Sequence, residues 1–254
     1  MKKHIFTWIA IGCLAVTSCK KYDNYVEPEQ TLTGRLIDVT TGQPIQLQPS
    51  GAVIRLEELS WGEKTGAAVI PQDLAVKPDG TFNNTKLFSG TYLVYPFNGP
   101  FVPFYSTDSG NPVDKRQKVE IKNGSTTIDF QVEPLLKVEW IGQPVLNADK
   151  TVTVSFRFTR GTTNAFYIKD IDQAWLNISN VPYLGDNTRD PNLSNSVVYS
   201  TTAAGNNALG TTVSLTSKLP LGTGRTYYLR VGVRTKDNIG QRYNYTDVRN
   251  IAIP

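Results

Sequence analysis

The side chains that most often perform catalysis and bind transition metals are confined to the first 19 residues of this chain. The sequence has one histidine, His4, and two cysteines, Cys13 and Cys19. Serine and cysteine nucleophiles are usually activated by an imidazole, and zinc, copper and non-haem iron sites are usually built from histidine and cysteine. Residues 20–254 can form neither kind of centre. Because they contain no cysteine, they cannot form a disulfide bond either.

Carboxylate chemistry is the main catalytic route that remains, beside a lysine Schiff base, a tyrosine or a serine–lysine dyad. A glycosidase needs two carboxylates about 5–9 Å apart in a cleft. The acidic side chains occur mostly singly, in settings that are typical of turns and caps. They include Asp38, Asp79, Asp149, Asp186 and Asp237. We therefore predict that the protein is not an enzyme.

One segment, residues 186–192, is dense enough in oxygen ligands to resemble a calcium loop. It lacks the glycine and the distal bidentate glutamate of the EF-hand spacing. Arg189 lies in its middle and would oppose a bound cation. We interpret the segment as a turn, and we expect neither a metal nor a cofactor.

Aromatic side chains are the more promising binding groups, and the densest run of them spans residues 95–105. Flat rings on a loop stiffened by prolines suit sugars, whose C–H faces stack on aromatic groups. We predict that Phe101, Phe104 and Tyr105 stack on a carbohydrate and that Asn98 bonds its hydroxyl groups. The same rings could instead fill the end of a sandwich or the joint between two domains, since aromatic side chains are commonly buried.

Two tryptophans are further candidates for a stacking surface. Trp61 lies in an expected loop just before Gly62. Trp175 lies in an expected strand, and the sequence is compatible with either the core or an exposed sheet face. Asp172 is close to Trp175 in the sequence and could accept hydrogen bonds from sugar hydroxyls, although a solvated loop explains it as well.

The N-terminal residues have the layout of a cleaved export signal. Lys2 and Lys3 form a positive segment, and residues 5–16 are mostly apolar but too few to span a bilayer. The following Val-Thr-Ser-Cys ending resembles a bacterial lipobox. This resemblance implies cleavage before Cys19 and attachment of acyl chains to it, which would anchor the protein durably to a membrane. The alternative is an ordinary secretory peptide in which Cys19 is incidental.

The charges give no sign of a nucleic-acid partner. The chain has 26 Lys and Arg against 22 Asp and Glu, and Lys2 and Lys3 would leave with the signal. The remaining charges are interspersed and form no basic stripe. Residues 20–30 are polar, contain Pro28 and show no periodicity, which indicates a tether between the lipid and the fold.

From residue 31 onward, short strands alternate with turns. Extended segments are expected at residues 32–38, 52–56 and 91–95. Asp79-Gly80 accepts the positive φ that a tight turn needs. Residues 118–122 and 127–132 alternate apolar and polar side chains on either side of Asn123-Gly124, which predicts a β-hairpin.

A second β-rich region follows Pro134. Strands are expected at residues 138–141, 152–158, 174–178, 213–215, 227–233 and 248–253. Leu221 lies six residues before Tyr227. This spacing resembles the tyrosine corner of fibronectin type III and immunoglobulin-like sandwiches, in which the phenol bonds back to the preceding corner.

The first β region resembles the prealbumin-like, carboxypeptidase-regulatory-type β-sandwich. Its opening pattern is matched by Gly34, Leu36, Asp38, Thr41, Gly42, Pro44 and Ile45. The chain resembles the Bacteroidota outer-membrane lipoprotein family known as domain of unknown function 3823. This closer resemblance covers the opening strand and residues 23–25, 77–82 and 87–92. Members of this family are encoded near starch-utilisation-type outer-membrane transporters and glycan-binding lipoproteins. The resemblance therefore implies a role in polysaccharide utilisation.

Together these inferences predict an all-β protein with two antiparallel β-sandwich domains. We expect a signal peptide at 1–18, the lipidated cysteine and tether at 19–30, a prealbumin-like sandwich at 31–134 and a fibronectin- or immunoglobulin-like sandwich at 135–254. We expect a non-catalytic accessory at the outer membrane, with the cell surface favoured, that binds or presents glycan. The alternative is a structural module that packs against a transporter or a partner lipoprotein and binds no sugar.

Overall fold

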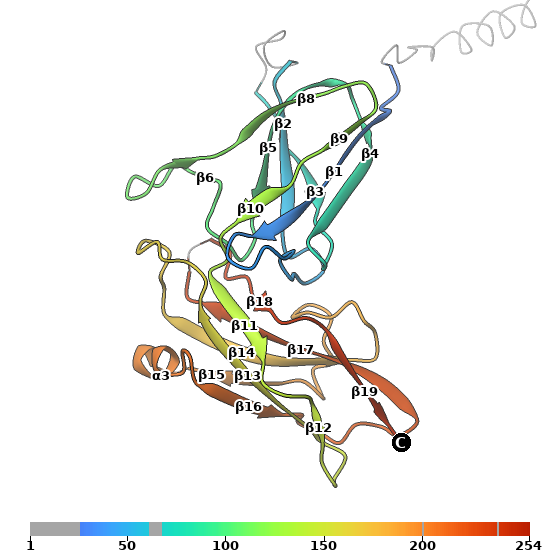
Figure 1. Cartoon of the computed structure of the whole chain (residues 1–254), viewed down its shortest axis with the longest axis vertical. Coiled ribbons are helices and arrows are strands. Elements are labelled where there is room, and N and C mark those ends of the chain that lie inside the picture. Colours follow the sequence, from blue (N-terminus) through green and yellow to red (C-terminus); the bar gives the residue numbers. More distant parts are fainter. Residues whose placement is uncertain (1–25, 61–67, 200, 238) are drawn as a thin grey trace, which may run out of the picture.

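The computed structural model describes residues 26–60, 68–199, 201–237 and 239–254. These residues form two β-rich domains stacked end to end, and the chain enters at the end of the first domain that is remote from the second (Figure 1). Among these described residues, helix is limited to short segments such as α3 (Thr202–Asn207). Within the described ranges, no helix is long and apolar enough to cross a bilayer. The predicted signal peptide and Cys19 lie outside these ranges.

The first domain is a sandwich of two four-stranded sheets, as expected. One contains β10 (Phe130–Val132), β1 (Gln30–Asp38), β4 (Thr81–Leu87) and β9 (Ser125–Thr127). The other has the order β3 (Gln72–Ala75), β2 (Val53–Glu58), β5 (Gly90–Phe97) and β8 (Gln117–Ile121). Apolar side chains from both sheets, among them Leu36, Ile54 and Phe130, form one buried core.

The predicted hairpin at Asn123-Gly124 is wrong. The turn is present, with φ of 59° at Asn123 and 104° at Gly124. However, β8 pairs with β5, whereas β9 pairs in parallel with β1, so the chain crosses from one sheet to the other at this turn. The expected segments at 118–122 and 127–132 alternate apolar and polar residues, and this alternation does not specify which sheet a strand joins. The parallel pairs that β1 makes with β9 and β10 are therefore exceptions in a mainly antiparallel fold.

The opening pattern of the first domain has a steric explanation. A Cβ atom placed on Gly34, in the middle of β1, would lie 1.7 Å from the carbonyl oxygen of Ile128 and 2.7 Å from the Phe82 ring. Gly34 therefore lets the link between β9 and β10 approach β1 closely. At the end of β1, the Asp38 carboxylate accepts hydrogen bonds from the backbone N–H of Thr40 (2.8 Å) and its hydroxyl (2.6 Å), which is turn chemistry.

The second domain contains two further sheets that enclose its own core. One comprises β11 (Leu136–Trp140), β13 (Val152–Arg160), β12 (Val145–Leu146) and β16 (Thr212–Thr216). The other comprises β15 (Asn195–Val198), β14 (Ile171–Ser179), β17 (Arg225–Thr235), β18 (Asn244–Tyr245) and β19 (Arg249–Ile253). Side chains such as Phe156, Leu176 and Val231 are buried between them.

The expected tyrosine corner is confirmed. The backbone N–H of Gly222 donates a hydrogen bond to the Tyr227 hydroxyl at 3.1 Å, and Leu221 is buried in the core beside it. The phenol thereby bonds back to the corner that precedes β17. The turn between β12 and β13 is closed by the Lys150 N–H, which donates to the Asn147 carbonyl at 2.9 Å.

Buried polar side chains bridge the two domains. Asn244 donates to the Pro100 carbonyl at 2.9 Å and accepts from the Leu136 N–H at 3.0 Å. Arg230 is buried and donates to the carbonyls of Leu47 (2.6 Å) and Leu184 (3.0 Å), which belong to different domains. Because unpaired buried groups are costly, these bonds favour one relative orientation of the domains.

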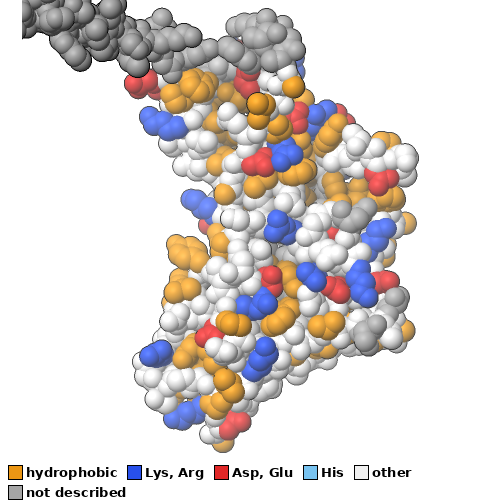
Figure 2. Space-filling view, turned by 180° about the vertical axis from the view of Figure 1, so that it is seen from behind, with side chains coloured by type: hydrophobic (Ala, Val, Ile, Leu, Met, Phe, Trp, Pro, Cys, Tyr) orange, Lys and Arg blue, Asp and Glu red, His pale blue; other side chains and the backbone are white. Residues whose placement is uncertain are grey.

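The surface carries charges of both signs. On the face shown in Figure 2, Lys and Arg side chains are interspersed with Asp and Glu, and the two lobes meet at a narrower waist. This distribution agrees with the interspersed charges of the sequence.

Candidate functional site

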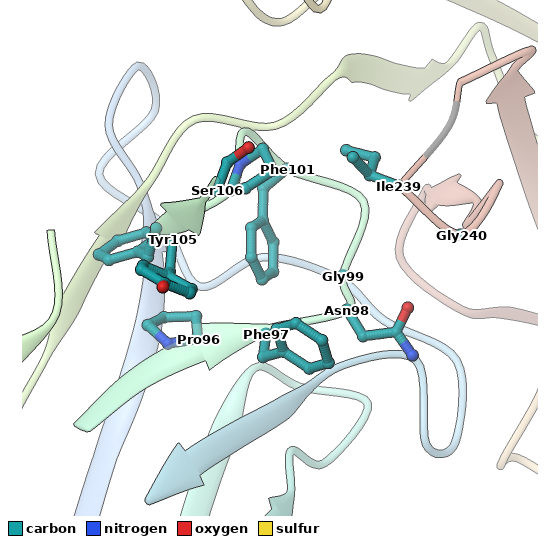
Figure 3. A pocket seen from close by; sticks show the side chains of 11 residues that line it. Pro96, Phe97, Asn98, Gly99, Phe101, Tyr105, Ser106, Ile239 and Gly240 are labelled. Carbon is teal, nitrogen blue, oxygen red and sulfur yellow. The ribbon is translucent and has the colours of Figure 1, made fainter. Parts of the chain in front are cut away.

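A cavity of about 330 Å³ lies where the two domains meet (Figure 3). The first domain lines it with residues 96–99, 101 and 103–106, which form the end of β5 and the segment after it. The second domain contributes Ile239 and Gly240 from the loop after β17. The cavity therefore depends on both domains and on their relative position.

Tight turns bring the first-domain segment over the end of its sandwich. Asn98 has a φ of 54°, which redirects the chain directly after β5. A Cβ atom on Gly99 would lie 2.1 Å from the Phe101 ring, so only glycine lets this ring fold back onto the turn. The chain then forms a small ribbon in which β6 (Tyr105–Ser106) pairs with β7 (Val113–Asp114).

Phe101 and Phe104 do not form the exposed stacking surface that the sequence suggested. Their exposed fractions are 2% and 8%, and both belong to the core of the first domain. The Phe104 ring meets the Phe130 ring edge to face, with centroids 5.8 Å apart. The physical reason is that the proline-rich segment turns inward to fill the end of the sandwich, which is the alternative that the sequence left open. The two rings line the inner wall of the cavity.

Phe97 and Tyr105 are the half-buried rings of the cavity, and an arginine packs on each. The Arg55 guanidinium carbon lies 3.7 Å from the centroid of the Phe97 ring. The Arg116 guanidinium carbon lies 4.0 Å from the centroid of the Tyr105 ring. Such cation–π contacts restrict the movement of the two rings. Phe97 and Tyr105 also lie in β5 and β6, and the backbones of these strands are each paired with other strands.

Acidic side chains hold these arginines. Arg55 forms a bidentate pair with Asp73 at 2.7 and 2.8 Å. Arg116 bonds Asp114 at 2.8 Å and Glu57 at 3.0 Å. The hydrogen bonds from Arg116 lower the pKa of Asp114 below its usual value, so this carboxylate stays ionised at neutral pH.

The exposed side chain of Asn98 lies at the rim of the cavity, next to the second domain. A Cβ atom on Gly240 would lie 2.7 Å from Asn98 Oδ1, and Gly240 has a φ of 116°. The positive φ favours glycine at position 240, and the lack of a side chain there leaves room for the Asn98 amide. The close-up view shows the Asn98 amide extending toward this loop (Figure 3).

Both halves of the chain match models of one protein family. Residues 30–133 match the N-terminal domain of a protein of unknown function, DUF3823, and residues 142–250 match the DUF3823 C-terminal domain. This chain belongs to the DUF3823 family. The resemblance inferred from the sequence is thereby confirmed.

Crystal structures of other proteins share the two-domain fold. A DUF3823 family protein from Bacteroides uniformis is 28% identical and superimposes with a TM-score of 0.78, covering 89% of this chain and 100% of that chain. A candidate carbohydrate binding protein from the same species is 22% identical, with a TM-score of 0.66 and the same coverage of both chains. A DUF3823 protein from Parabacteroides merdae is 21% identical, with a TM-score of 0.64 and again the same coverage. The curated proteins gave no match.

The other predicted site residues of this DUF3823 chain lie elsewhere. Trp175 is half-buried on the outer face of its sheet, and the Arg189 guanidinium carbon lies 3.8 Å from its ring centroid. Asp172 forms an ion pair with Arg234 at 2.7 Å. Neither Trp175 nor Asp172 lines the cavity. Trp61 lies outside the described residues.

The segment at residues 186–192 behaves as a turn. Arg189 forms an ion pair with Asp186 within the segment, and the Asp190 carboxylate accepts a hydrogen bond from the Asn192 N–H at 2.8 Å. In the described part of the chain, no three His, Cys, Asp or Glu side chains come together as a metal-binding group.

Several residues that line the cavity of this DUF3823 protein were not among the predicted site residues, and they include Phe97, Ile239 and Gly240. Phe97 belongs to the aromatic run at residues 95–105 and lies two residues after the expected strand at 91–95, which could have identified it. Ile239 and Gly240 carry no comparable signal, because nothing in the sequence connects the loop after β17 with Asn98.

Proposed function

We propose that this DUF3823 protein is a non-catalytic lipoprotein of the outer membrane, anchored through Cys19, that binds glycan for a polysaccharide-utilisation system. The observation that carries the proposal is the cavity at the domain junction, where the Phe97 and Tyr105 rings lie near the exposed amide of Asn98. Carbohydrate sites combine aromatic surfaces that stack on sugar rings with amides that bond hydroxyl groups.

The size and polarity of the cavity favour a small neutral sugar. Its volume of about 330 Å³ is near the lower end of the range for ligand sites, which is about 300–1,000 Å³. None of the described residues that line it carries a charged side chain. We therefore propose that it holds one sugar unit, or the end of an oligosaccharide, without an acidic group.

Two further observations support this proposal. The candidate carbohydrate binding protein from Bacteroides uniformis shares the fold over its whole length. The lipobox-like ending at Cys19 supports attachment to a membrane. An outer-membrane transporter or a partner lipoprotein would then receive the glycan.

Affinity electrophoresis tests the proposal. Residues 20–254 are run in gels that contain different soluble neutral polysaccharides. We expect retardation by at least one of them, and Phe97→Ala and Tyr105→Ala should each weaken the binding about tenfold, which corresponds to about 1.4 kcal/mol.

Tyr183→Ala is the matched control, because Tyr183 is exposed on the second domain and does not line the cavity. It should leave the retardation unchanged. The absence of retardation across a broad panel would contradict the proposal and favour a module that binds only other proteins. Retardation that survives both cavity substitutions would place the glycan elsewhere on the molecule.

A further inference from the structure

Exposed apolar side chains gather at the end of the first domain that is remote from the second. Ile70 is 84% exposed, Val26 83%, Phe88 48% and Val69 37%. We call these four residues the apolar tip. Exposed apolar residues that stand singly are common, but several at one end of a domain indicate a contact surface.

Strand register places the tip residues at the same end. Leu87 pairs with Gln30 at the start of β1, so Phe88 lies where the chain enters the domain. Gln72 pairs with Leu56 near the end of β2, and Ile70 precedes this pair by two residues. The Thr91 N–H donates to Ser60 Oγ at 3.1 Å, which joins the end of β2 to the start of β5. In Figure 1, β1 begins at this end.

The tether limits how far this end can lie from Cys19. Residues 20–29 separate Cys19 from the first strand. A chain of this length spans at most about 35 Å even when fully extended. If Cys19 carries acyl chains, the end that bears the apolar tip is therefore the part of the fold held nearest to the bilayer.

We propose that the apolar tip contacts the lipid bilayer. Val26, Val69, Ile70 and Phe88 enter the interfacial region and orient the first domain on the membrane. The cavity then lies at the opposite end of this domain, directed away from the lipid. This inference rests on the lipid anchor of the proposed function and goes beyond it, because an acylated tether alone would leave the orientation free.

Single-cysteine labelling tests this orientation. Residues 20–254 contain no cysteine, so Ile70→Cys and Phe88→Cys each give one labelling site for a fluorophore that responds to polarity. Val145→Cys is the matched control, since Val145 is an exposed apolar residue of the second domain. The lipidated full chain is reconstituted into vesicles of phosphatidylethanolamine and phosphatidylglycerol, and flotation measures the anchoring separately.

We expect labels at positions 70 and 88 to shift to shorter wavelengths in vesicles and to be quenched by nitroxide lipids, whereas the label at position 145 stays unchanged. Flotation with equal quenching at all three positions would overturn the inference and leave the anchor intact. Loss of flotation would overturn the anchor and the inference with it. A shift that grows with protein concentration in the absence of vesicles would assign the tip to contact between copies and would likewise overturn it.

Discussion

At the scale of single residues, the buried guanidinium of Arg230 is central to the domain interface. It donates to the carbonyls of Leu47, Leu184 and Thr246 at 2.6, 3.0 and 2.8 Å, and no carboxylate of the described residues forms an ion pair with it. Burial lowers its pKa to about 10, so it remains charged at neutral pH. Backbone dipoles from both domains thus replace water around the charge.

Arg230→Ala should lower the free energy of unfolding by roughly 3 kcal/mol, because three buried carbonyls lose their donor. Urea unfolding measures this loss. Arg225→Ala is the control, since Arg225 is exposed at the start of the same strand, and it should change the free energy by less than about 0.5 kcal/mol. Equal stabilities for the two variants would show that the interface does not depend on Arg230.

Tyr245 makes the interface sensitive to alkaline pH. Its hydroxyl donates to Gln48 Oε1 of the first domain at 2.6 Å and accepts from the Asp186 N–H at 3.0 Å. Burial raises the pKa of this phenol above its ordinary value. Because the folded pKa exceeds the unfolded one, the contribution of the neutral phenol is complete below about pH 10 and is lost as the pH rises further.

The free energy of unfolding of the wild type should therefore fall above pH 10, and that of Tyr245→Phe should fall less steeply. At neutral pH the variant should be about 1 kcal/mol less stable because it lacks the hydroxyl contacts. Tyr243 also contributes to the loss of stability above pH 10 in both proteins, since burial raises its pKa to about 12. Identical slopes from pH 7 to pH 11 would contradict this role of Tyr245.

At the scale of elements, the two glycines of the opening pattern have different roles. Gly34→Ala should destabilise the protein by more than about 3 kcal/mol or prevent folding, because the new Cβ would collide with the Ile128 carbonyl. Gly42→Ala should cost only about 1 kcal/mol, since Gly42 has a φ of 68° but no atom near the new Cβ. Thermal unfolding measures the loss of stability in each variant. Similar losses would show that the close approach of Ile128 to β1 is not the reason why residue 34 is a glycine.

The positions of the strands with clear alternation were predictable from the sequence. The pairing of these strands was predictable only in part. β1, β5, β13, β14 and β17 follow the expected segments, since one face of each is buried. The two-residue strands β6, β7, β12 and β18 are too short to show a period. The parallel pairing of β9 with β1 depends on contacts between the sheets, which local patterns do not encode.

At the scale of the whole molecule, the candidate site exists because two domains meet. The aromatic run predicted which part of the first domain lines the cavity. Burial of Phe101 and Phe104 and the approach of Ile239 and Gly240 follow from long-range packing, so residue types alone could not predict them.

Gly240→Ala tests whether this approach matters for binding. The new Cβ would displace the Asn98 amide or the loop, and we expect glycan affinity to fall about tenfold in calorimetric titration. Gly142→Ala is the control, because Gly142 has a φ of 71° with no neighbouring atom and should keep wild-type affinity. Equal affinities would show that the second domain takes no part in the site.

Glycan binding in the cavity between the domains can be observed residue by residue. The most direct measurement is a two-dimensional NMR titration of isotope-labelled residues 20–254 with an oligosaccharide from the polysaccharide that retards the protein. We expect the shifts to concentrate in residues 96–106 and at Ile239 and Gly240, while the indole N–H of Trp175 stays unchanged. Shifts centred on Trp175 and Asp172, with none at Asn98 or Tyr105, would contradict binding in this cavity.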